Sequence, residues 1–550
     1  MVEAIKNMKY IFVLVVLSYF FFMFGNGILG LTNPDEVFYA QTAKEMAKHS
    51  SWLVPYLFDA PNFEKPIFLY WLLRISFILF GVSSFSARFF PAVFAALGVI
   101  AVYYLGLFGF GNSKKAFYSA LVLLSSGLYI GLARTVFTDM VFSVWILLAL
   151  CFFIWGYLRR ENKALSLILF FVCCAFAVLT KGPLGIIIPF LIVIIFLWFR
   201  RETRYLCCSS MLWGILIFII IAFPWYMYMF IKYKNAFIQE FFYNDHIRRF
   251  LEAEHKANDT WYFYPLSMVG CMFPWSIFVP VSLFSLTKRH LRQDEPFYLF
   301  LICWVMVVFV TFQTAHSKLV SYIFSLFPAL ALLIGDFLYD IFINRKNNFS
   351  NLVFLFTWCI LVLFPIALIV ALIFYSEKLS FKMPLYLVIF FLFFLLTIML
   401  YFILRHRFVR VFSFLVFFCL PILFTVPFIK TDIEPYISSK AAGEYLLNNI
   451  NPDSVILCAK PFLRGIRYYT DRKIAALGSN FFSPHPITFL DSDEKVKNFL
   501  YSQAVTYCVL NKSKLEDIKR ISQGEFKVTI LKIIGNEYIL KIQPLNNLNR

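Results

Sequence analysis

The sequence carries little charge for its length. Aspartate, glutamate, lysine and arginine make up 15% of its 550 residues, whereas soluble globular chains carry about 25%. Its 21 glycines are too few for a collagen-like chain, and its 11 cysteines are too few for a small disulfide scaffold. These shortages exclude a soluble multidomain enzyme, and the high apolar content excludes a disordered chain.

Hydrophobic residues take the place of the missing charge. They make up 61% of the chain, which includes 71 phenylalanines, and the mean hydropathy is +0.76. A helix needs about 20 apolar residues to cross a bilayer. Apolar runs predict thirteen such spans, near residues 10–31, 87–109, 116–133, 140–158, 164–180, 184–199, 208–230, 264–286, 296–313, 319–339, 352–375, 383–404 and 411–429. We therefore expect a polytopic α-helical membrane protein.

Two apolar runs need a closer look. The first, near 10–31, is too long for a cleaved signal peptide and has no small-x-small site after it, so we interpret it as an uncleaved first helix. The run from Ile67 to Phe80 is shorter and contains Arg74. Its length is more typical of a re-entrant or interfacial segment than of a span.

Basic residues recur in short clusters between the apolar runs. The net charge of +19 therefore indicates membrane topology rather than binding to nucleic acid. With thirteen spans every cluster falls on one side, which the positive-inside rule assigns to the cytoplasm. If the Ile67–Phe80 run also crossed, every cluster after the first would lie outside, so we expect this run along the outer interface. The clusters are Lys6 and Lys9; Lys114 and Lys115; Arg159, Arg160 and Lys163; Arg200, Arg201 and Arg204; Lys288, Arg289 and Arg292; Arg345 and Lys346; and Arg405, Arg407 and Arg410.

The last part of the chain has a different pattern. After a membrane domain over residues 1–429, residues 430–550 lose the long apolar runs and predict an extracytoplasmic α/β domain. Its cysteines, Cys458 and Cys508, either form a disulfide or are two buried strand thiols, and the second alternative is favoured. The expected strands are Val455–Ala459, Val505–Leu510, Lys527–Ile534 and Tyr538–Ile542.

Two outward-facing connections are long, at residues 32–86 and 231–262. Long ordered loops are usually functional, and these two hold most of the acidic, basic and imidazole groups exposed on that side. The first begins with Asn33-Pro34-Asp35-Glu36, and Asn33 or Asp35 could simply cap a helix that ends at Lys48. The alternative is that a carboxylate at the membrane surface acts as a base toward an acceptor from outside.

Further candidates follow the same side of the membrane. A pair such as Glu64-Lys65 is usually solvated, but at headgroup depth a lysine is a natural phosphate partner. Asp139 begins the fourth span, where an acid is often only a cap. Lys181 stands in the tight turn Thr180-Lys181-Gly182-Pro183.

The second long connection adds imidazole and guanidinium groups. His246 and Arg249 are three residues apart, so a helix would present both on one face. Lys318 lies just before the tenth span, and Tyr322 lies one turn inside it. Acids and phosphate-binding cations at one interface favour an enzyme that acts on a lipid-linked phosphate. A transporter would instead bury charges at mid-membrane, and a lipid-phosphate carrier or flippase remains the alternative class.

In this order the motifs resemble those of the GT-C membrane glycosyltransferases. Within that group the chain is similar to the bacterial aminoarabinose (4-amino-4-deoxy-L-arabinose) transferases that modify lipid A, which are relatives of the protein O-mannosyltransferases. The motifs are Asn-Pro-Asp-Glu-x-x-Tyr-Ala from Asn33, Phe63-Glu64-Lys65-Pro66, Ser86-Ala87-Arg88-Phe89-Phe90-Pro91-Ala92, Thr180-Lys181-Gly182-Pro183, Asp245-His246-Ile247-Arg248-Arg249-Phe250, Phe273-Pro274-Trp275 and Ser317-Lys318-Leu319 followed by Tyr322.

The resemblance implies a GT-C fold of about thirteen transmembrane helices, with the N-terminus in the cytoplasm and a periplasmic α/β tail. It also implies an undecaprenyl-phosphate-linked sugar as donor and a lipid A phosphate as acceptor, at the periplasmic face of the bacterial inner membrane. The expected partners are these two lipids and the phospholipid bilayer, without nucleic acid. A protein hydroxyl or another envelope glycan is the alternative acceptor.

The resemblance also suggests roles for single residues. Asp35 would be the acceptor-facing carboxylate and Asp139 a second acid, with Glu36 grouped with them as a catalytic candidate. The expected ligands of the donor phosphate are Lys65, Lys181, Arg249, Lys318 and Tyr322. Glu64 and His246 match positions where a divalent cation can bind. Because two side chains fall short of the four or more ligands such ions usually need, we expect an opportunistic ion and no obligatory cofactor.

Two positions depart from the family pattern. Phe38 stands where relatives often have arginine, and Asn62 stands where close relatives have tyrosine. Both lie in the expected site, so the transferred sugar is either aminoarabinose or a related amino sugar such as a hexosamine.

Overall fold

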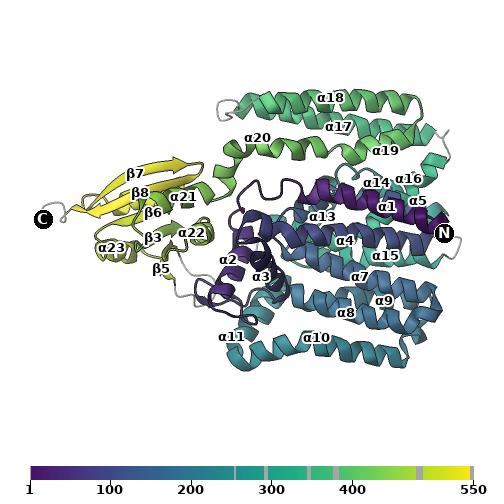
Figure 1. Cartoon of the computed structure of the whole chain (residues 1–550), viewed down its shortest axis with the longest axis horizontal. Coiled ribbons are helices and arrows are strands. Elements are labelled where there is room, and N and C mark those ends of the chain that lie inside the picture. Colours follow the sequence, from purple (N-terminus) through teal and green to yellow (C-terminus); the bar gives the residue numbers. More distant parts are fainter. Residues whose placement is uncertain are drawn as a thin grey trace.

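The computed structural model describes residues 2–252, 256–289, 295–343, 348–375, 383–478 and 487–545. A block of long helices lying side by side forms one part, and a mixed sheet with its helices forms the other (Figure 1). The N-terminus lies at the end of the helix block that is farthest from the sheet. Helices α2 (Asp35–Lys48) and α3 (Phe68–Phe80) lie between the two parts.

The helices of the block follow the apolar runs of the sequence. They are α1 (Val2–Ser18), α4 (Ser84–Phe110), α5 (Ser113–Leu124), α6 (Gly127–Ala133), α7 (Thr138–Leu158), α8 (Lys163–Lys181), α9 (Leu184–Phe199), α10 (Ser209–Tyr233), α13 (Phe263–Cys271), α14 (Phe278–Arg289), α15 (Pro296–Gln313), α16 (Phe327–Ile343), α17 (Asn348–Tyr375), α18 (Met383–Leu404), α19 (Phe408–Phe417) and α20 (Leu420–Ile437). Shorter helical turns are η1 (Tyr19–Met23), η2 (Arg160–Asn162), η3 (Thr203–Leu206), α11 (Asn235–Phe237), η4 (Ile238–Arg248), α12 (Arg249–Leu251), η5 (Lys256–Asn258) and η6 (Val320–Leu326).

Nine helices in the described ranges are long and apolar enough to cross a bilayer. The number is ten if α5 and α6, which meet at a bend of 66°, form one broken span. Shorter apolar helices cover residues 7–23, 68–80 and 184–199, and each of the thirteen expected runs overlaps a helix. The polytopic helical class is therefore confirmed, while the count of thirteen stays a prediction.

The first apolar run differs from its predicted extent of 10–31. Helical structure ends at Met23, and Gly25 adopts a φ of +68° that favours glycine. The residues that follow are apolar but not helical, and Leu31 is fully buried. A Cβ atom on Gly30 would lie 2.5 Å from the Ser438 hydroxyl, so the loop packs closely on the chain after α20. Burial of this loop, rather than lipid contact, explains its apolar residues.

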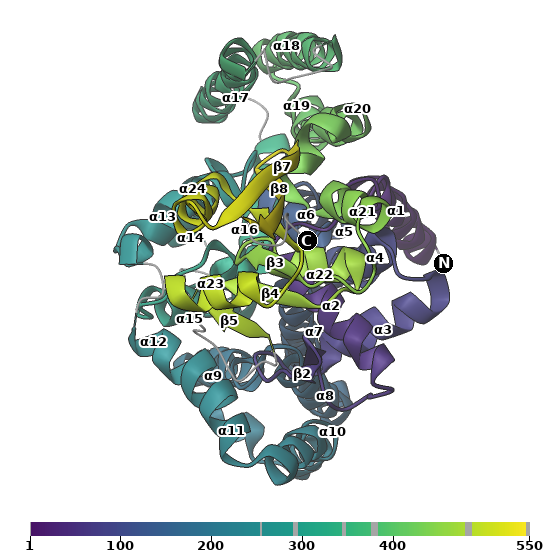
Figure 2. The ribbon, with the colours of Figure 1, turned by 90° about the vertical axis from the view of Figure 1, so that its left-hand side faces the viewer.

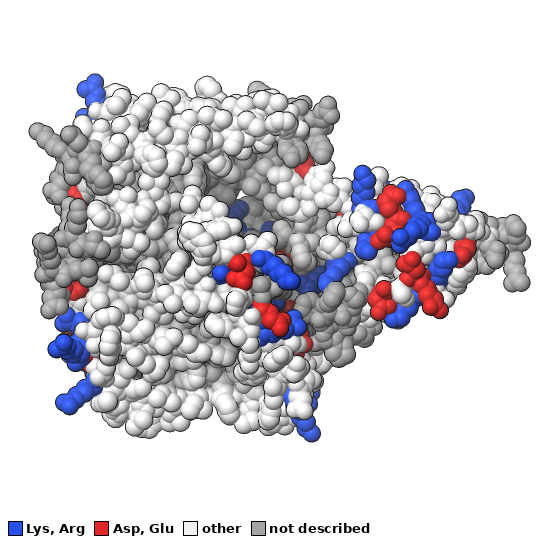
Figure 3. Space-filling view, turned by 180° about the vertical axis from the view of Figure 1, so that it is seen from behind, with Lys and Arg blue, Asp and Glu red and all other residues white. Residues whose placement is uncertain are grey.

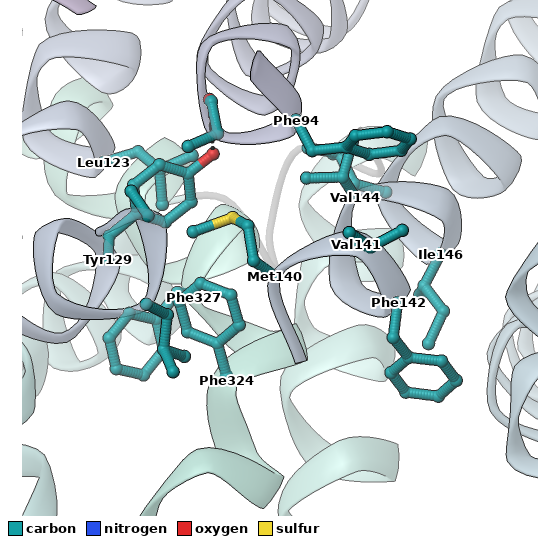
Figure 4. Close-up of a cluster of buried hydrophobic side chains, with 14 of the residues drawn as sticks. Phe94, Leu123, Tyr129, Met140, Val141, Phe142, Val144, Ile146, Phe324 and Phe327 are labelled. Carbon is teal, nitrogen blue, oxygen red and sulfur yellow. Dashed lines mark hydrogen bonds between the residues drawn. The ribbon is translucent and has the colours of Figure 1, made fainter. Parts of the chain in front are cut away.

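The helix block has an aromatic and aliphatic core. In Figure 4, Met140 of α7 lies close to three aromatic rings, those of Tyr129 in α6, Phe324 in η6 and Phe327 in α16. The Tyr129 hydroxyl, buried among apolar groups, donates to the Ala95 carbonyl at 2.8 Å, which satisfies a polar atom that could not be left unpaired there. On the face seen in Figure 3, the helix block shows little charge between its two ends, as expected for helices that face lipid.

The C-terminal part contains a six-stranded sheet in the order β5-β4-β3-β6-β8-β7. The strands are β3 (Ile456–Ala459), β4 (Ile474–Leu477), β5 (Thr488–Leu490), β6 (Thr506–Leu510), β7 (Phe526–Ile534) and β8 (Glu537–Pro544), and β1 (Tyr56–Leu57) and β2 (Ala60–Pro61) form a separate ladder. The first four strands of the large sheet are parallel, and β8 and β7 are antiparallel. Its helices are α21 (Lys440–Asn449), α22 (Leu463–Thr470), α23 (Asp493–Tyr501) and α24 (Lys512–Ile521). The four expected strands are confirmed, and α20 passes residue 430 on its way to this part.

Both cysteines of the tail are free and buried, as favoured from the sequence. Cys508 of β6 pairs in register with Leu457 of β3, so Cys458 points to the opposite face of the sheet. A disulfide between Cys458 and Cys508 would have to cross the sheet. The two thiols instead pack into the hydrophobic cores on either side.

Candidate functional site

The site is built around the first turns of α2. The helix begins at Asp35, and the residue before it, Pro34, makes no side-chain capping bond. Asn33 donates to the Ser439 hydroxyl at 2.5 Å instead of capping the helix. Asp35 is exposed and makes no hydrogen bond or ion pair with the described residues. A simple capping role for either residue therefore does not account for this motif.

Glu36 has the opposite environment. It is fully buried, and Arg88 of α4 donates to both of its carboxylate oxygens, from Nε at 2.8 Å and from Nη2 at 2.5 Å. The Val136 amide donates to it at 2.9 Å, and the Thr32 amide and hydroxyl donate at 2.9 and 3.0 Å. Arg88 also donates at 3.0 Å to the carbonyls of Asn26, Leu29 and Gly30. Such a satisfied buried pair fixes the start of α2 against α4 and the segment before α7.

Tyr39 marks the point where three other carboxylates converge. Burial raises the pKa of Tyr39 far above its usual value, and the negative charges of Asp139, Asp245 and Glu64 act in the same direction. These acids come from α7, from η4 and from the loop before α3. Segments far apart in the sequence therefore meet one turn after Asp35.

Two of the residues expected to bind the donor phosphate contact the same carboxylate, that of Asp245. Lys65 donates to Asp245, and Arg249 Nη1 lies 3.1 Å from Asp245 Oδ1. The Ser317 amide donates to the Arg249 carbonyl at 3.2 Å, which places the Ser317-Lys318 segment next to this pair. The side chain of His246, the remaining candidate of this loop, lies outside the described part of the structure.

The other cations also face carboxylates. Lys181 donates to Asp139 at 2.6 Å, and its Nζ lies 5.0 Å from the centre of the Tyr322 ring. Lys318 is buried and donates to Asp259 at 3.1 Å. Hydrogen bonds to Asp259, from His316 first and then from Lys318, lower the pKa of Asp259 below its usual value. Each of the four cations expected to hold the donor phosphate thus has a carboxylate partner.

Glu64 lies among cations rather than among metal ligands. Its side chain is 20% exposed, and Arg464 Nη2 lies 3.9 Å from Glu64 Oε1. Burial raises the pKa of Glu64, while the charges of Arg464, Lys65 and Arg249 oppose that rise. No group of three or more histidine, cysteine or acidic side chains that could hold a metal occurs in the described ranges. The three cations near Glu64 oppose the approach of a divalent ion, although the Asp245 carboxylate also lies near Glu64. No step of the chemistry is assigned to such an ion.

The tail packs directly on α2, as the view from the tail shows for α22 (Figure 2). Lys44 of α2 pairs with Asp471 at 2.6 Å. Arg467 of α22 lies 3.2 Å from Glu45 and 2.6 Å from Asp59. The tail therefore forms one side of the site.

Several residues at the site had no role assigned from the sequence. Arg88, Tyr39 and Asp245 lie within the recognised motifs, and the i, i+4 spacing of Asp245 and Arg249 was a usable signal for their pairing. Asp259 and Arg464 gave no signal, because their partners are distant in the sequence. Of the expected residues, Asp35 makes no contact with the acids and cations around Tyr39 that the structure describes, and lies near them only because it is on α2. Glu36 is turned away from this group and binds Arg88.

The fold has close counterparts among solved structures. The aminoarabinose transferase ArnT from Cupriavidus metallidurans bound to undecaprenyl phosphate matches with a TM-score of 0.75 and 19% identity, over 97% of this chain and 98% of that chain. Its apo state matches with a TM-score of 0.76 at 18% identity. This chain has the GT-C fold of that transferase. The oligosaccharyltransferase AglB from Archaeoglobus fulgidus shares the fold more distantly, with a TM-score of 0.58 at 13% identity over 94% of this chain and 70% of that chain.

Sequence relatives point the same way. The chain is 30% identical over 355 residues to the undecaprenyl phosphate-α-4-amino-4-deoxy-L-arabinose arabinosyl transferase of Photorhabdus laumondii, covering 62% of this chain and 63% of the relative. A second such transferase, from Proteus mirabilis, is 30% identical over 56% of this chain and 55% of the relative. The chain thus spans less than two thirds of the length of these curated relatives. Residues 7–238 match the family model for dolichyl-phosphate-mannose-protein mannosyltransferase.

Proposed function

We propose that this chain is a glycosyltransferase that moves a sugar from undecaprenyl phosphate to a phosphate of lipid A. The names of its relatives describe arabinosyl transfer from undecaprenyl phosphate, and the solved counterpart binds undecaprenyl phosphate. The observation that carries the proposal is the exposed carboxylate of Asp35 at the start of α2. One helical turn later, Tyr39 lies near Asp139 and Asp245, the acids that hold Lys181, Lys65 and Arg249. The transferred sugar is aminoarabinose or a related amino sugar.

The cations would bind the donor phosphate. Lys65 and Arg249 share Asp245 in the described structure, so a phosphate can take over their hydrogen bonds without moving either far. The bond between the anomeric carbon and the donor phosphate oxygen breaks, and the lipid phosphate leaves with the electron pair. Fixed cations balance that charge as it develops, which is where electrostatic stabilisation lowers a barrier most. Lys181, with its ammonium 5.0 Å from the Tyr322 ring, and Lys318 would supply further contacts to the donor phosphate.

The acids would serve the acceptor and the scaffold. An acceptor phosphate oxygen attacks the anomeric carbon and forms the new bond, and Asp35 orients it and takes any proton it still carries. Asp139 holds Lys181 in place. Glu36 acts as a positioning residue, because all of its hydrogen bonds hold α2 to the bundle. In this proposal a divalent ion can bind at Glu64 and His246, but the reaction does not require it.

A second candidate function is transfer to a protein hydroxyl. The mannosyltransferase family model, which covers residues 7–238, favours it, because that stretch includes α2 and the cations of the first half of the site. The two functions share the donor chemistry and differ in the acceptor. A carrier or flippase would move the donor lipid without breaking its sugar–phosphate bond.

Mass spectrometry of lipid A from cells with and without this gene tests the main proposal. An added pentosamine mass supports aminoarabinose, and an added hexosamine mass identifies the other sugar. If lipid A is unchanged, purified protein in nanodiscs should be given the sugar-loaded donor with a protein acceptor. Donor movement without any glycosylated product would contradict both transferase functions and support a carrier.

We further propose that the membrane part over residues 1–429 is catalytic. Its active site and the tail, residues 430–550, would face the periplasm at the inner membrane. The opposite placement of the N-terminus and the sheet supports this orientation. Reporter fusions after Lys115, Arg160 and Arg201 should report the cytoplasm, and a fusion at the C-terminus should report the periplasm. A cytoplasmic C-terminus would contradict the proposed orientation.

A further inference from the structure

Arg464 of the tail lies beside Glu64. It stands in the first turn of α22, and its guanidinium carbon lies 4.6 Å from the centre of the Phe38 ring. Its Nη2 lies 3.9 Å from Glu64 Oε1, which is too long for a hydrogen bond. The side chain is 25% exposed. The guanidinium therefore lies over an aromatic ring and is partly exposed, so a ligand can reach it.

Arg464 lies between the acceptor side and the donor side of the proposed site. Phe38 is three residues after Asp35 on α2, so both lie on the same face of that helix. Glu64 directly precedes Lys65, which is the first expected ligand of the donor phosphate. Lys65 is engaged with Asp245, whereas Arg464 makes no hydrogen bond with any residue that the structure describes.

The backbone that carries Arg464 is held rigidly. A Cβ atom on the next residue, Gly465, would lie 2.2 Å from Asn33 Oδ1 and 2.9 Å from the Ser439 side chain, so the backbone of α22 packs closely on both of these side chains. One turn later Arg467 pairs with Glu45 and Asp59. Arg464 is thus positioned by a fixed contact between α22 and α2 rather than by a free loop.

The place of α22 in the sheet points in the same direction. It follows the carboxyl end of β3, which pairs with β4 on one side and with β6 on the other. The chain proceeds from β3 to β4 and β5 and then returns to the opposite side of β3 with β6. Ligands of open α/β sheets bind at such a switch point, outside the carboxyl ends of the strands. Here α22, the helix that follows this edge of β3, packs on α2.

We propose that Arg464 binds the phosphate of the acceptor lipid, so that the tail supplies part of the acceptor site. This inference rests on the proposed function, in which two anionic phosphates must approach one sugar carbon. Their mutual repulsion requires a cation for each. Lys65 and Arg249 serve the donor, and Arg464 is the cation placed for the acceptor. A planar guanidinium can hold a phosphate through two parallel hydrogen bonds, which a lysine cannot reproduce.

The test compares Arg464→Ala and Arg464→Lys with Arg520→Ala, a control that removes an exposed guanidinium of the same domain. Transfer is measured over a range of lipid A concentrations, and donor binding is measured separately with undecaprenyl phosphate. Loss of a charge-assisted contact should lower kcat/KM for the acceptor about ten- to a hundredfold. Donor affinity should stay within about twofold, Arg464→Lys should recover only part of the loss, and Arg520→Ala should match the wild type.

Phe38→Leu gives an independent check, because it removes the ring but keeps a large apolar side chain. Loss of one cation–π contact should lower kcat/KM for the acceptor about two- to fivefold. Combined with Arg464→Ala it should add nothing further, since the ring acts through the guanidinium. Full additivity of the two variants would overturn the assigned role of Phe38 as a support for Arg464.

Equal loss of donor and acceptor affinity in Arg464→Ala would overturn the inference and assign Arg464 to the donor phosphate. Unchanged kinetics in this variant would overturn it while leaving the proposed function intact. If the wild type transfers no sugar, the proposed function fails, and binding of intact against dephosphorylated lipid A decides the inference separately. A preference for intact lipid A that disappears in both Arg464 variants supports it, and a preference retained in both overturns it.

Discussion

The first two residues of α2, Asp35 and Glu36, both carry a carboxylate, but the two carboxylates have opposite environments. Glu36 is fully buried and all its hydrogen bonds go to Arg88, Thr32 and Val136, whereas its neighbour Asp35 is exposed and unengaged by the described residues. A carboxylate whose oxygens are all occupied cannot receive a proton without loosening the fold. An exposed one can, at little structural cost. The difference shows that burial, rather than residue type, distinguishes a carboxylate that holds the fold together from one that is available to a substrate.

Asp35→Asn should have the largest effect on activity. Removing a positioned general base typically costs about 10²- to 10⁴-fold in rate, while a surface substitution changes stability by less than about 0.5 kcal/mol. Transfer should therefore collapse with the thermal unfolding midpoint unchanged. With a phosphate acceptor the defect should shrink as pH rises past about 6, where the phosphate loses its second proton. A clear fall in the unfolding midpoint would break the comparison, because Asp35 would then belong to the scaffold.

Glu36→Gln should act on stability instead. Breaking a buried ion pair by removing one charge costs about 3–5 kcal/mol, because the other charge is left without compensation. The free energy of unfolding in detergent should fall by that amount, and the double variant Glu36→Gln with Arg88→Met should recover part of it. Asp35→Asn is the matched control one residue away. Wild-type stability together with lost transfer in Glu36→Gln would place Glu36 in the chemistry.

Glu537 extends the comparison to the tail. Ser439 donates to Glu537 and accepts from Asn33, so this buried acid lies behind the α2 N-terminus. Burial raises the pKa of Glu537 from its ordinary 4.5 to about 8. Between these values the folded chain keeps a proton that the unfolded chain has lost, so stability should fall by about 1.4 kcal/mol per pH unit as pH rises.

Unfolding of the wild type and of Glu537→Gln at pH 5 and pH 7 measures this effect. The wild type should lose about 3 kcal/mol more than the variant over that interval, by the same relation. Cys458, the other titratable group near Glu537, keeps its proton at both pH values because burial raises the pKa of its thiol. The same pH dependence in both proteins would show that Glu537 is ionised in the fold.

Lys65→Ala should have the smallest effect of the four. One charge-assisted contact to the donor phosphate is worth roughly 1.5–3 kcal/mol, or about ten- to a hundredfold in donor affinity. Lys114→Ala removes an exposed lysine at the start of α5 and should leave affinity unchanged. Binding of undecaprenyl phosphate to both variants in nanodiscs measures the difference. Weaker acceptor binding with donor affinity intact would reverse the division between donor and acceptor cations.

Hydropathy was enough to predict the helix block and four strands of the large sheet, β3, β6, β7 and β8. It misjudged the run after Met23, because buried loop residues such as Leu31 are as apolar as lipid-facing ones. It also missed β4, whose Ile-Ala-Ala-Leu sequence is buried throughout and shows no alternation. Periodicity cannot separate such a short strand from a helical segment.

The candidate site was predictable only where local context carried a signal. Lys65, Asp139 and Lys181 stood out because they interrupt outward turns between apolar runs. Their partners were not predictable, since Asp245 meets Lys65 across 180 residues and Arg464 meets Glu64 from another part of the fold. Tertiary packing brings such pairs together, and a single sequence does not reveal it.

The contacts of the tail with α2 also bear on how the protein is made. The Gly30 amide donates to Glu434, the Leu31 amide donates to Tyr469, and Lys44 pairs with Asp471. Partners more than 400 residues apart cannot meet until the ribosome has completed nearly the whole chain. The segment that carries Asp35 is among the first to be synthesised and among the last to acquire its neighbours. The site around Asp35 is therefore complete only after the tail has been synthesised and has docked on α2.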